Sequence, residues 1–130
     1  MTDKFQLGLS QRRAVMGEEF VDRAFDNASE FTRPLQELVT SNCWGETWSD
    51  KTLNKGTRSL LTISLLTALR ASTELKGHVR GALRNGCSEA EIQAALLHAT
   101  VYCGFPAGVE AFRAADEVIQ AWKENEGQKA

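Results

Sequence analysis

The sequence predicts an all-α protein, and three observations lead to that fold class. Apolar residues recur at helical spacing through most of the 130 residues. No series of short alternating segments joined by turns indicates β-strands. Both prolines, Pro34 and Pro106, stand near expected helix starts, where the missing N–H of proline costs little. We therefore expect one compact domain of about six helices over residues 1–130, with its core within residues 10–122.

The first half of the chain predicts two helices. Apolar residues among charges predict the first over residues 10–27, although Gly17 weakens it. The second begins near Thr32 and ends near residues 43–48, an aromatic segment too short for a long helix of its own. Its apolar stripe consists of Leu35, Leu38 and Val39.

The helix predicted over residues 55–71 differs in kind, because it is apolar nearly all round. Its large apolar side chains are Leu60, Leu61, Ile63, Leu65, Leu66 and Leu69. A helix of this type needs cover on several sides. In a chain of this size, we expect another subunit to supply some of that cover.

Three further elements follow from helix start and stop signals. A helix begins after Ser72 and ends at Asn85-Gly86, where glycine is the expected C-terminal stop. Ser88 and Glu91 fit a capping box. The helix that this box opens should bury Ile92, Leu96, Ala99 and Cys103. A last helix starts around Pro106, with a tail expected to fray from Glu124 and an apolar face of Ala111, Phe112, Ala115, Ile119 and Trp122.

Composition limits the class of function. Fifteen Lys and Arg against 17 Asp and Glu give a net charge of −2, and the basic residues are scattered. A nucleic-acid binder would carry a basic surplus. The first ten residues have no stretch typical of a signal peptide, and no apolar run approaches the length of a membrane span. Three widely spaced cysteines match no disulfide framework, so we expect a cytoplasmic protein with reduced thiols.

Glu74 and His78 form the strongest candidate for chemistry. A spacing of four places both on one helix face, and a carboxylate beside an imidazole can move a proton near neutral pH. The simpler interpretation is a surface pair worth about 0.2–0.5 kcal/mol. A metal site using these two residues with His98 or Glu46 is a weaker alternative, because no HExxH, HxxxH or Cys/His cluster is present. We therefore expect no metal.

Other candidates are ambiguous by themselves. Arg58, near the start of the very apolar helix, either reaches solvent or faces a carboxylate. Glu46 lies between Trp44 and Trp48, where a carboxylate is either partly desolvated, with a raised pKa, or paired locally. His98 is expected at the surface or an interface, and Cys103 as an inert core thiol.

Taken together, several blocks of the sequence resemble the carboxymuconolactone decarboxylase family over about residues 10–120. The blocks are residues 12–17 (RRAVMG), 21–24 (VDRA), 31–40 (FTRPLQELVT), 44–48 (WGETW), 57–60 (TRSL), 74–78 (ELKGH), 82–86 (ALRNG) and 102–108 (YCGFPAG). The resemblance implies an all-α fold like that of alkylhydroperoxidase D, assembled as a homotrimer or homohexamer. Peroxidase relatives carry a CxxC pair where this chain has Ala71 and Glu74, which argues against a thiol peroxidase. His98 and Phe105 depart from the Gln and Val that are common in the subfamily.

The resemblance also implies an activity. The expected reaction removes CO2 from 4-carboxymuconolactone and leaves the enol-lactone of 3-oxoadipate, a step of protocatechuate breakdown by the β-ketoadipate pathway. No cofactor is needed, because the unsaturated carbonyl of the lactone accepts the electron pair. The small-molecule lactone carboxylate is the only partner that this reaction requires.

We assign expected roles to five residues on this basis. His78 would donate the proton, while Glu74 orients its ring and keeps its pKa near neutrality. Glu46 would share the proton transfer or position His78, Arg58 would bind a carboxylate or the enolate oxygen, and Trp44 would contribute an apolar wall. Two alternatives stand beside this hypothesis: a non-catalytic helical oligomeric binding protein with the same fold, and a decarboxylase of a different lactone.

Overall fold

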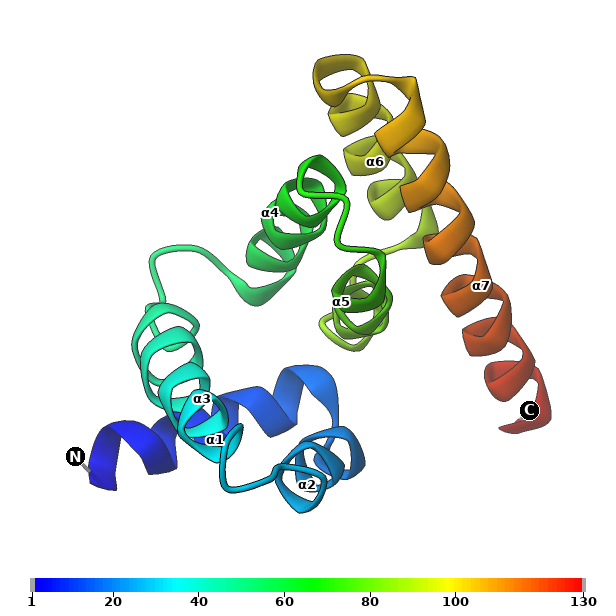
Figure 1. Cartoon of the computed structure of the whole chain (residues 1–130). Coiled ribbons are helices and arrows are strands. Elements are labelled where there is room, and N and C mark those ends of the chain that lie inside the picture. Colours follow the sequence, from blue (N-terminus) through cyan, green and yellow to red (C-terminus); the bar gives the residue numbers. More distant parts are fainter. Residues whose placement is uncertain (1, 130) are drawn as a thin grey trace. The chain divides into compact units, whose positions relative to one another are not determined.

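The computed structural model describes residues 2–129, and these residues form helices joined by short connections (Figure 1). The described part of the chain contains seven α-helices, one π-helix and no strand. The all-α prediction is therefore confirmed. The chain divides into two compact units, of which the first ends at Asn54 and the second begins at Lys55. Each unit has its own buried apolar cluster.

The N-terminal unit begins with α1 (Thr2–Met16) and α2 (Glu18–Asp26). The single helix predicted over residues 10–27 is therefore wrong in its start and in its continuity. The break falls at Gly17, whose φ of 98° lies in the left-handed region that costs glycine least. Apolar periodicity continues across the break, which is why the sequence pattern did not reveal it.

The unit continues with α3 (Arg33–Leu38) and the π-helix η1 (Val39–Thr47). The predicted start near Thr32 and the predicted end near residues 43–48 are both confirmed. The second half of this helical run is nevertheless a π-helix, in which the amide of Trp48 donates to the carbonyl of Cys43, five residues earlier, at 2.9 Å. Of the predicted apolar stripe, Val39 packs against the apolar cluster of the unit, whereas Leu35 and Leu38 are 57% and 55% exposed.

Two glycines allow α1 to cross η1 at close range. A Cβ atom on Gly8 would overlap the carbonyl oxygen of Thr40, and one on Gly45 would overlap that of Lys4. Since both obstacles are backbone atoms, neither can move aside cheaply. The crossing buries an apolar cluster of Val15, Met16, Val21, Trp44 and Trp48.

The C-terminal unit consists of four α-helices, drawn from green to red in Figure 1. They are α4 (Lys55–Ala68), α5 (Ser72–Arg84), α6 (Glu89–Cys103) and α7 (Phe105–Lys129). Helix α5 packs against both α4 and α7, and α6 packs against the same two helices. The core of the unit consists of Ile63, Leu75, Val79, Ala82, Ile92, Leu96, Ala111, Ala115 and Ile119, with smaller contributions from Cys87 and Ala114.

Three details of this unit differ from the sequence predictions. Helix α4 ends at Ala68 rather than at residue 71. Cys103 is exposed rather than buried, because it lies at the end of α6. Helix α7 begins at Phe105, which confirms the predicted start around Pro106, but it continues through the tail that was expected to fray. No helix of the described residues is both long enough and apolar enough to cross a membrane.

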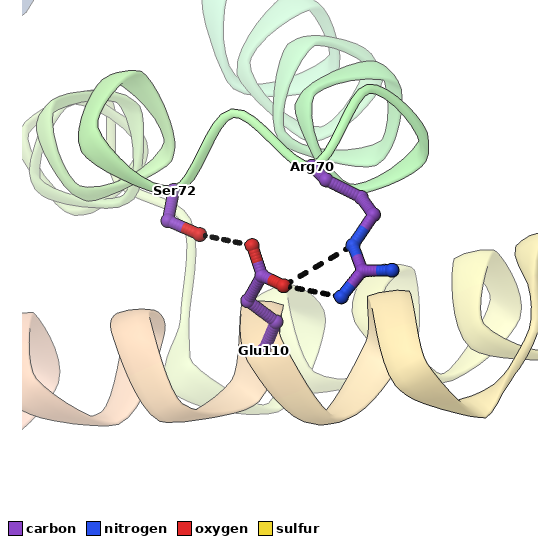
Figure 2. A network of polar contacts seen from close by, with 3 residues as sticks. All are labelled: Arg70, Ser72 and Glu110. Atoms are coloured by element: carbon purple, nitrogen blue, oxygen red, sulfur yellow. Dashed lines mark hydrogen bonds and ion pairs between the residues drawn. The ribbon is translucent and has the colours of Figure 1, made fainter.

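A network of charged and polar side chains joins the α4–α5 turn to α7 (Figure 2). One Glu110 carboxylate oxygen accepts from Nη2 and Nε of Arg70 at 2.6 and 3.1 Å, and the other accepts from the Ser72 hydroxyl at 2.8 Å. Arg70 is the non-glycine residue with a positive φ, 57°, among those described. Hydrogen bonds from Arg70 and Ser72 lower the pKa of Glu110. The carboxylate thus holds the turn that sets the start of α5.

Removal of the predicted cap of α6 should weaken the C-terminal unit. The structure contains both bonds of the box: the Glu91 amide donates to Ser88 Oγ at 3.0 Å, and the Ser88 amide donates to Glu91 Oε1 at 2.8 Å. Ser88→Ala should lower the free energy of unfolding by about 1 kcal/mol, measured by urea denaturation with circular dichroism. Ser88→Asp, which keeps an oxygen acceptor, should remain close to wild type. Equal stability of the alanine variant would show that the box contributes nothing.

Candidate active site

Helix α5 determines where His78 lies. Leu75, Val79 and Ala82 are buried on its inner face, and His78 is three residues from Leu75 and four from Ala82. The imidazole therefore borders the buried face and is itself half-buried, with its Nδ1 atom shielded from solvent. This is the border position that the sequence pattern predicts.

The environment of His78 favours the neutral ring. Burial, and then the positive charge of Arg80, lower its pKa from the ordinary 6.5 to about 4, while the negative charge of Glu74 acts in the opposite direction. The expectation that Glu74 keeps this pKa near neutrality is therefore wrong, because desolvation outweighs one exposed carboxylate. At neutral pH the ring carries one N–H donor and one nitrogen acceptor.

Glu74 occupies the first turn of α5, one helical turn before His78. Its carboxylate is exposed and still acts electrostatically on the imidazole. The structure thus brings the predicted pair together on one face. Sequence reasoning gave no role to Arg80, because residues two apart on a helix do not share a face. Only the burial of the ring makes the charge of Arg80 effective.

Arg58 lies half-buried in the first turn of α4. Asn85 Nδ2 donates to Ser59 Oγ at 2.9 Å, so the start of α4 lies beside the end of α5. His78 precedes Asn85 by seven residues, which is about 10 Å along a helix axis. Arg58 and His78 therefore come from adjoining helices, roughly two helical turns apart.

The other two predicted site residues belong to the N-terminal unit. Glu46 is exposed, and its carboxylate accepts from Lys4 Nζ at 3.0 Å. The partner lies 42 positions away in the sequence, on α1, so neither partial desolvation nor local pairing describes Glu46. Trp44 is 4% exposed, and its ring stacks on Trp48 with centroids 4.7 Å apart. Trp44 therefore forms part of the core of that unit.

The described residues do not support the alternative of a metal site. No group of three or more His, Cys, Asp or Glu side chains in the described residues is placed to hold a metal ion. His98 is exposed on α6 and stacks on Tyr102 with ring centroids 4.8 Å apart, as expected for a surface or interface residue. Glu74, His78 and His98 therefore do not form a three-ligand site.

Comparison with known proteins supplies the context for this arrangement. The model of the carboxymuconolactone decarboxylase family matches residues 33–117. Nitrosuccinic acid decarboxylase of Metarhizium robertsii is 45% identical over 115 residues, which cover 88% of this chain and 80% of the relative. 4-Carboxymuconolactone decarboxylase of Acinetobacter baylyi is 37% identical over 117 residues, covering 90% of this chain and 87% of the relative.

The charge state of His78 can be measured directly. Its imidazole carbon proton should titrate in NMR spectra with a pKa of about 4. Arg80→Gln should raise this pKa, because a nearby positive charge is removed, and Glu74→Gln should lower it further. A His78→Gln sample assigns the resonance against that of His98. A wild-type pKa at or above 6.5 would contradict the effect of burial.

The same shift has a consequence for stability. Between pH 6.5 and 4 the unfolded chain binds a proton at His78 that the folded chain does not bind, so the folded state loses stability as the pH falls through this range. The full contribution is present above pH 6.5 and amounts to at most about 3 kcal/mol. His78→Gln should therefore show a flatter dependence of the unfolding free energy on pH.

Proposed function

Since this chain belongs to the carboxymuconolactone decarboxylase family, and its decarboxylase relatives support a carboxy-lyase, we propose that it decarboxylates 4-carboxymuconolactone. The product would be the enol-lactone of 3-oxoadipate, within protocatechuate breakdown. The observation that carries the proposal is the Glu74–His78 pair at the border of the buried face of α5. A relative named for this reaction that covers 90% of the chain supports the choice of substrate.

The reaction needs no redox step. The bond to the departing carboxylate breaks, its electron pair passes into the unsaturated lactone carbonyl as a dienolate, and CO2 leaves. A proton then returns to carbon. We assign this proton to His78, whose ring is neutral in the free protein. A bound dianion beside the ring would raise the pKa of the imidazole. The imidazole would therefore become protonated when the substrate binds, and it would later donate this proton to carbon.

The remaining roles follow from the positions of the side chains. Glu74 would favour the protonated ring through its negative charge. Arg58, on the helix that adjoins α5, would bind a substrate carboxylate or the enolate oxygen as a two-pronged donor. Glu46 would share in proton transfer and Trp44 would supply apolar surface. The exposed carboxylate of Glu46 is compatible with its role, whereas the burial of Trp44 restricts it to a small exposed edge.

A second candidate substrate is nitrosuccinic acid, favoured by the relative of 45% identity that is named for it. Its nitro group sits on the carbon that carries one carboxyl group. Loss of CO2 from this carbon leaves the electron pair on the nitro group as a nitronate, and protonation at carbon completes the reaction. Both substrates thus carry their own electron acceptor and at least two carboxylates, and both need the same single proton.

An assay with both substrates tests the proposed function. Dialysed, EDTA-treated protein should consume 4-carboxymuconolactone, followed by its ultraviolet absorbance, with release of CO2. His78→Ala should lower kcat by about 10²-fold, because the proton donor is lost. His98→Ala, the change at the other histidine, should keep wild-type turnover.

Each other result of this assay has a defined meaning. Turnover of nitrosuccinic acid alone would assign the second substrate. Folded wild-type protein that turns over neither compound would favour a different lactone or the non-catalytic binding protein. Near-wild-type turnover by a folded His78→Ala variant would remove His78 from the mechanism.

We further propose that the protein assembles as a homotrimer or homohexamer. Leu61, Leu65 and Leu69 recur at a spacing of four and are 49%, 64% and 74% exposed. Val101, Tyr102 and Phe105, around the α6–α7 junction, are 77–80% exposed. Contiguous apolar surface of this kind is typical of an interface.

Light scattering coupled to size-exclusion chromatography tests the assembly. The wild-type chain should elute with three or six times the monomer mass of 14.3 kDa. Leu65→Glu should reduce that mass, because it would bury a carboxylate in the interface. Gln93→Glu, at an exposed position of α6, adds the same charge and should leave the mass unchanged. A monomeric wild type would contradict the proposal.

A further inference from the structure

Arg12, in the N-terminal unit, is a buried cation without an anionic partner among the described residues. Its side chain belongs to α1, and the residue is only 7% exposed. Its Nη1 donates to the hydroxyl of Thr40, on η1, at 3.1 Å. Its guanidinium carbon lies 5.9 Å from the centroid of the Phe25 ring. No carboxylate in the described part of the chain forms an ion pair with it.

This environment does not balance the charge. A buried charge is normally paired with an opposite charge, because water no longer solvates it. A hydroxyl and an aromatic ring supply only partial negative charge. The thiol of Cys43 interacts electrostatically with Arg12, but burial raises the pKa of Cys43, so the thiol stays neutral at pH 7. Burial also lowers the pKa of Arg12, yet a guanidinium remains charged.

The guanidinium is nevertheless reachable. Arg12 keeps 7% of its surface exposed, and its Nε and Nη2 are not among the described buried polar atoms that lack a partner. Cys43, the charged group's polar neighbour, is itself an exposed residue. A small anion can thus approach N–H groups whose other side is held in place by Thr40 and Phe25.

Two other arginines of the same unit, Arg13 and Arg33, differ from Arg12 because each lies beside a carboxylate. Arg13, the next residue, donates to Asp22 at 2.8 Å. Arg33 also lies over the Phe25 ring, at 5.8 Å, but its side chain is 55% exposed and lies 3.7 Å from a Glu37 oxygen. Both therefore have a carboxylate partner, whereas Arg12 is buried and forms no ion pair with a carboxylate among the described residues.

We propose that Arg12 is a carboxylate anchor that binds a small dicarboxylic acid through its free N–H groups. The inference deepens the proposed function, on which it rests, because both candidate substrates are polycarboxylates. A guanidinium held rigidly at the edge of an apolar cluster binds a carboxylate in two-pronged fashion with little loss of side-chain freedom.

Succinate is a suitable probe, because it offers two carboxylates and does not react. Trp44 and Trp48 lie in the apolar cluster of the same unit, so their fluorescence should respond when the full-length chain is titrated. Saturable binding of succinate is expected, with no response to its uncharged diamide. Arg12→Lys should weaken succinate binding about tenfold or more, because an ammonium cannot copy the two-pronged contact, and Arg12→Gln should weaken it further.

Arg33→Gln is the matched control, since it removes the other guanidinium over the same ring but leaves Arg12 in place. It should bind succinate as the wild type does. Circular dichroism checks that each variant is folded, and Arg12→Lys keeps the charge if Arg12→Gln is unstable. In the decarboxylase assay, Arg12→Lys should raise KM with little change in kcat.

The outcomes separate this inference from the proposed function. Succinate binding that depends on Arg12, in a protein that turns over neither substrate, would support the anchor and refute the decarboxylase. Turnover with unchanged succinate binding and KM in folded Arg12→Lys would refute the anchor alone. A change in assembly mass in Arg12→Lys without weaker succinate binding would also refute it, because the anion would then be a carboxylate of a second copy.

Discussion

The packing of α5 against both α4 and α7 is the constraint on which the C-terminal unit depends. It buries Leu75, Val79 and Ala82, and it leaves His78 at the border of that face. The start of the helix is held by the contact of Glu110 with Arg70 and Ser72, and its end by the hydrogen bond from Asn85 to Ser59. Because both ends are held, the imidazole cannot relax towards water without disturbing the unit. Its low pKa is therefore a consequence of the fold.

A ring that is neutral at rest suits the chemistry of this family better than a permanently charged one. Decarboxylation begins from an anion and proceeds through an anion, so the proton is needed only after CO2 has left. A permanent imidazolium would also pair with the substrate carboxylate and hold the charge that must leave as CO2. A substrate that raised the pKa of His78 on binding would cause the imidazole to become protonated, and the imidazole could then act as the proton donor.

The two units differ in the charge state of a buried basic side chain. In the C-terminal unit, burial lowers the pKa of His78, so that its imidazole is neutral at pH 7. In the N-terminal unit, the buried basic residue is Arg12. Its guanidinium cannot lose its proton and forms no ion pair with a carboxylate among the described residues. The first arrangement leaves an imidazole that is neutral at pH 7, and the second leaves a guanidinium that keeps its charge.

Local sequence determined the helices whose signals lie in neighbouring residues. The capping box of Ser88 and Glu91, the stop at Asn85-Gly86 and the shared face of Glu74 and His78 are all confirmed, because each depends on contacts within a few residues. The family resemblance likewise indicated a decarboxylase, which the comparisons support at the level of the family.

Tertiary structure decided what depends on the environment of a side chain. Periodicity did not show that Gly17, with its φ of 98°, breaks a helix or that η1 widens into a π-helix, because apolar spacing continues through both places. Nor could it show the exposure of Leu35 and Leu38, the low pKa of His78 or the unpaired charge of Arg12. These properties are set by desolvation and by charges on other turns and other helices, and a one-dimensional pattern contains neither.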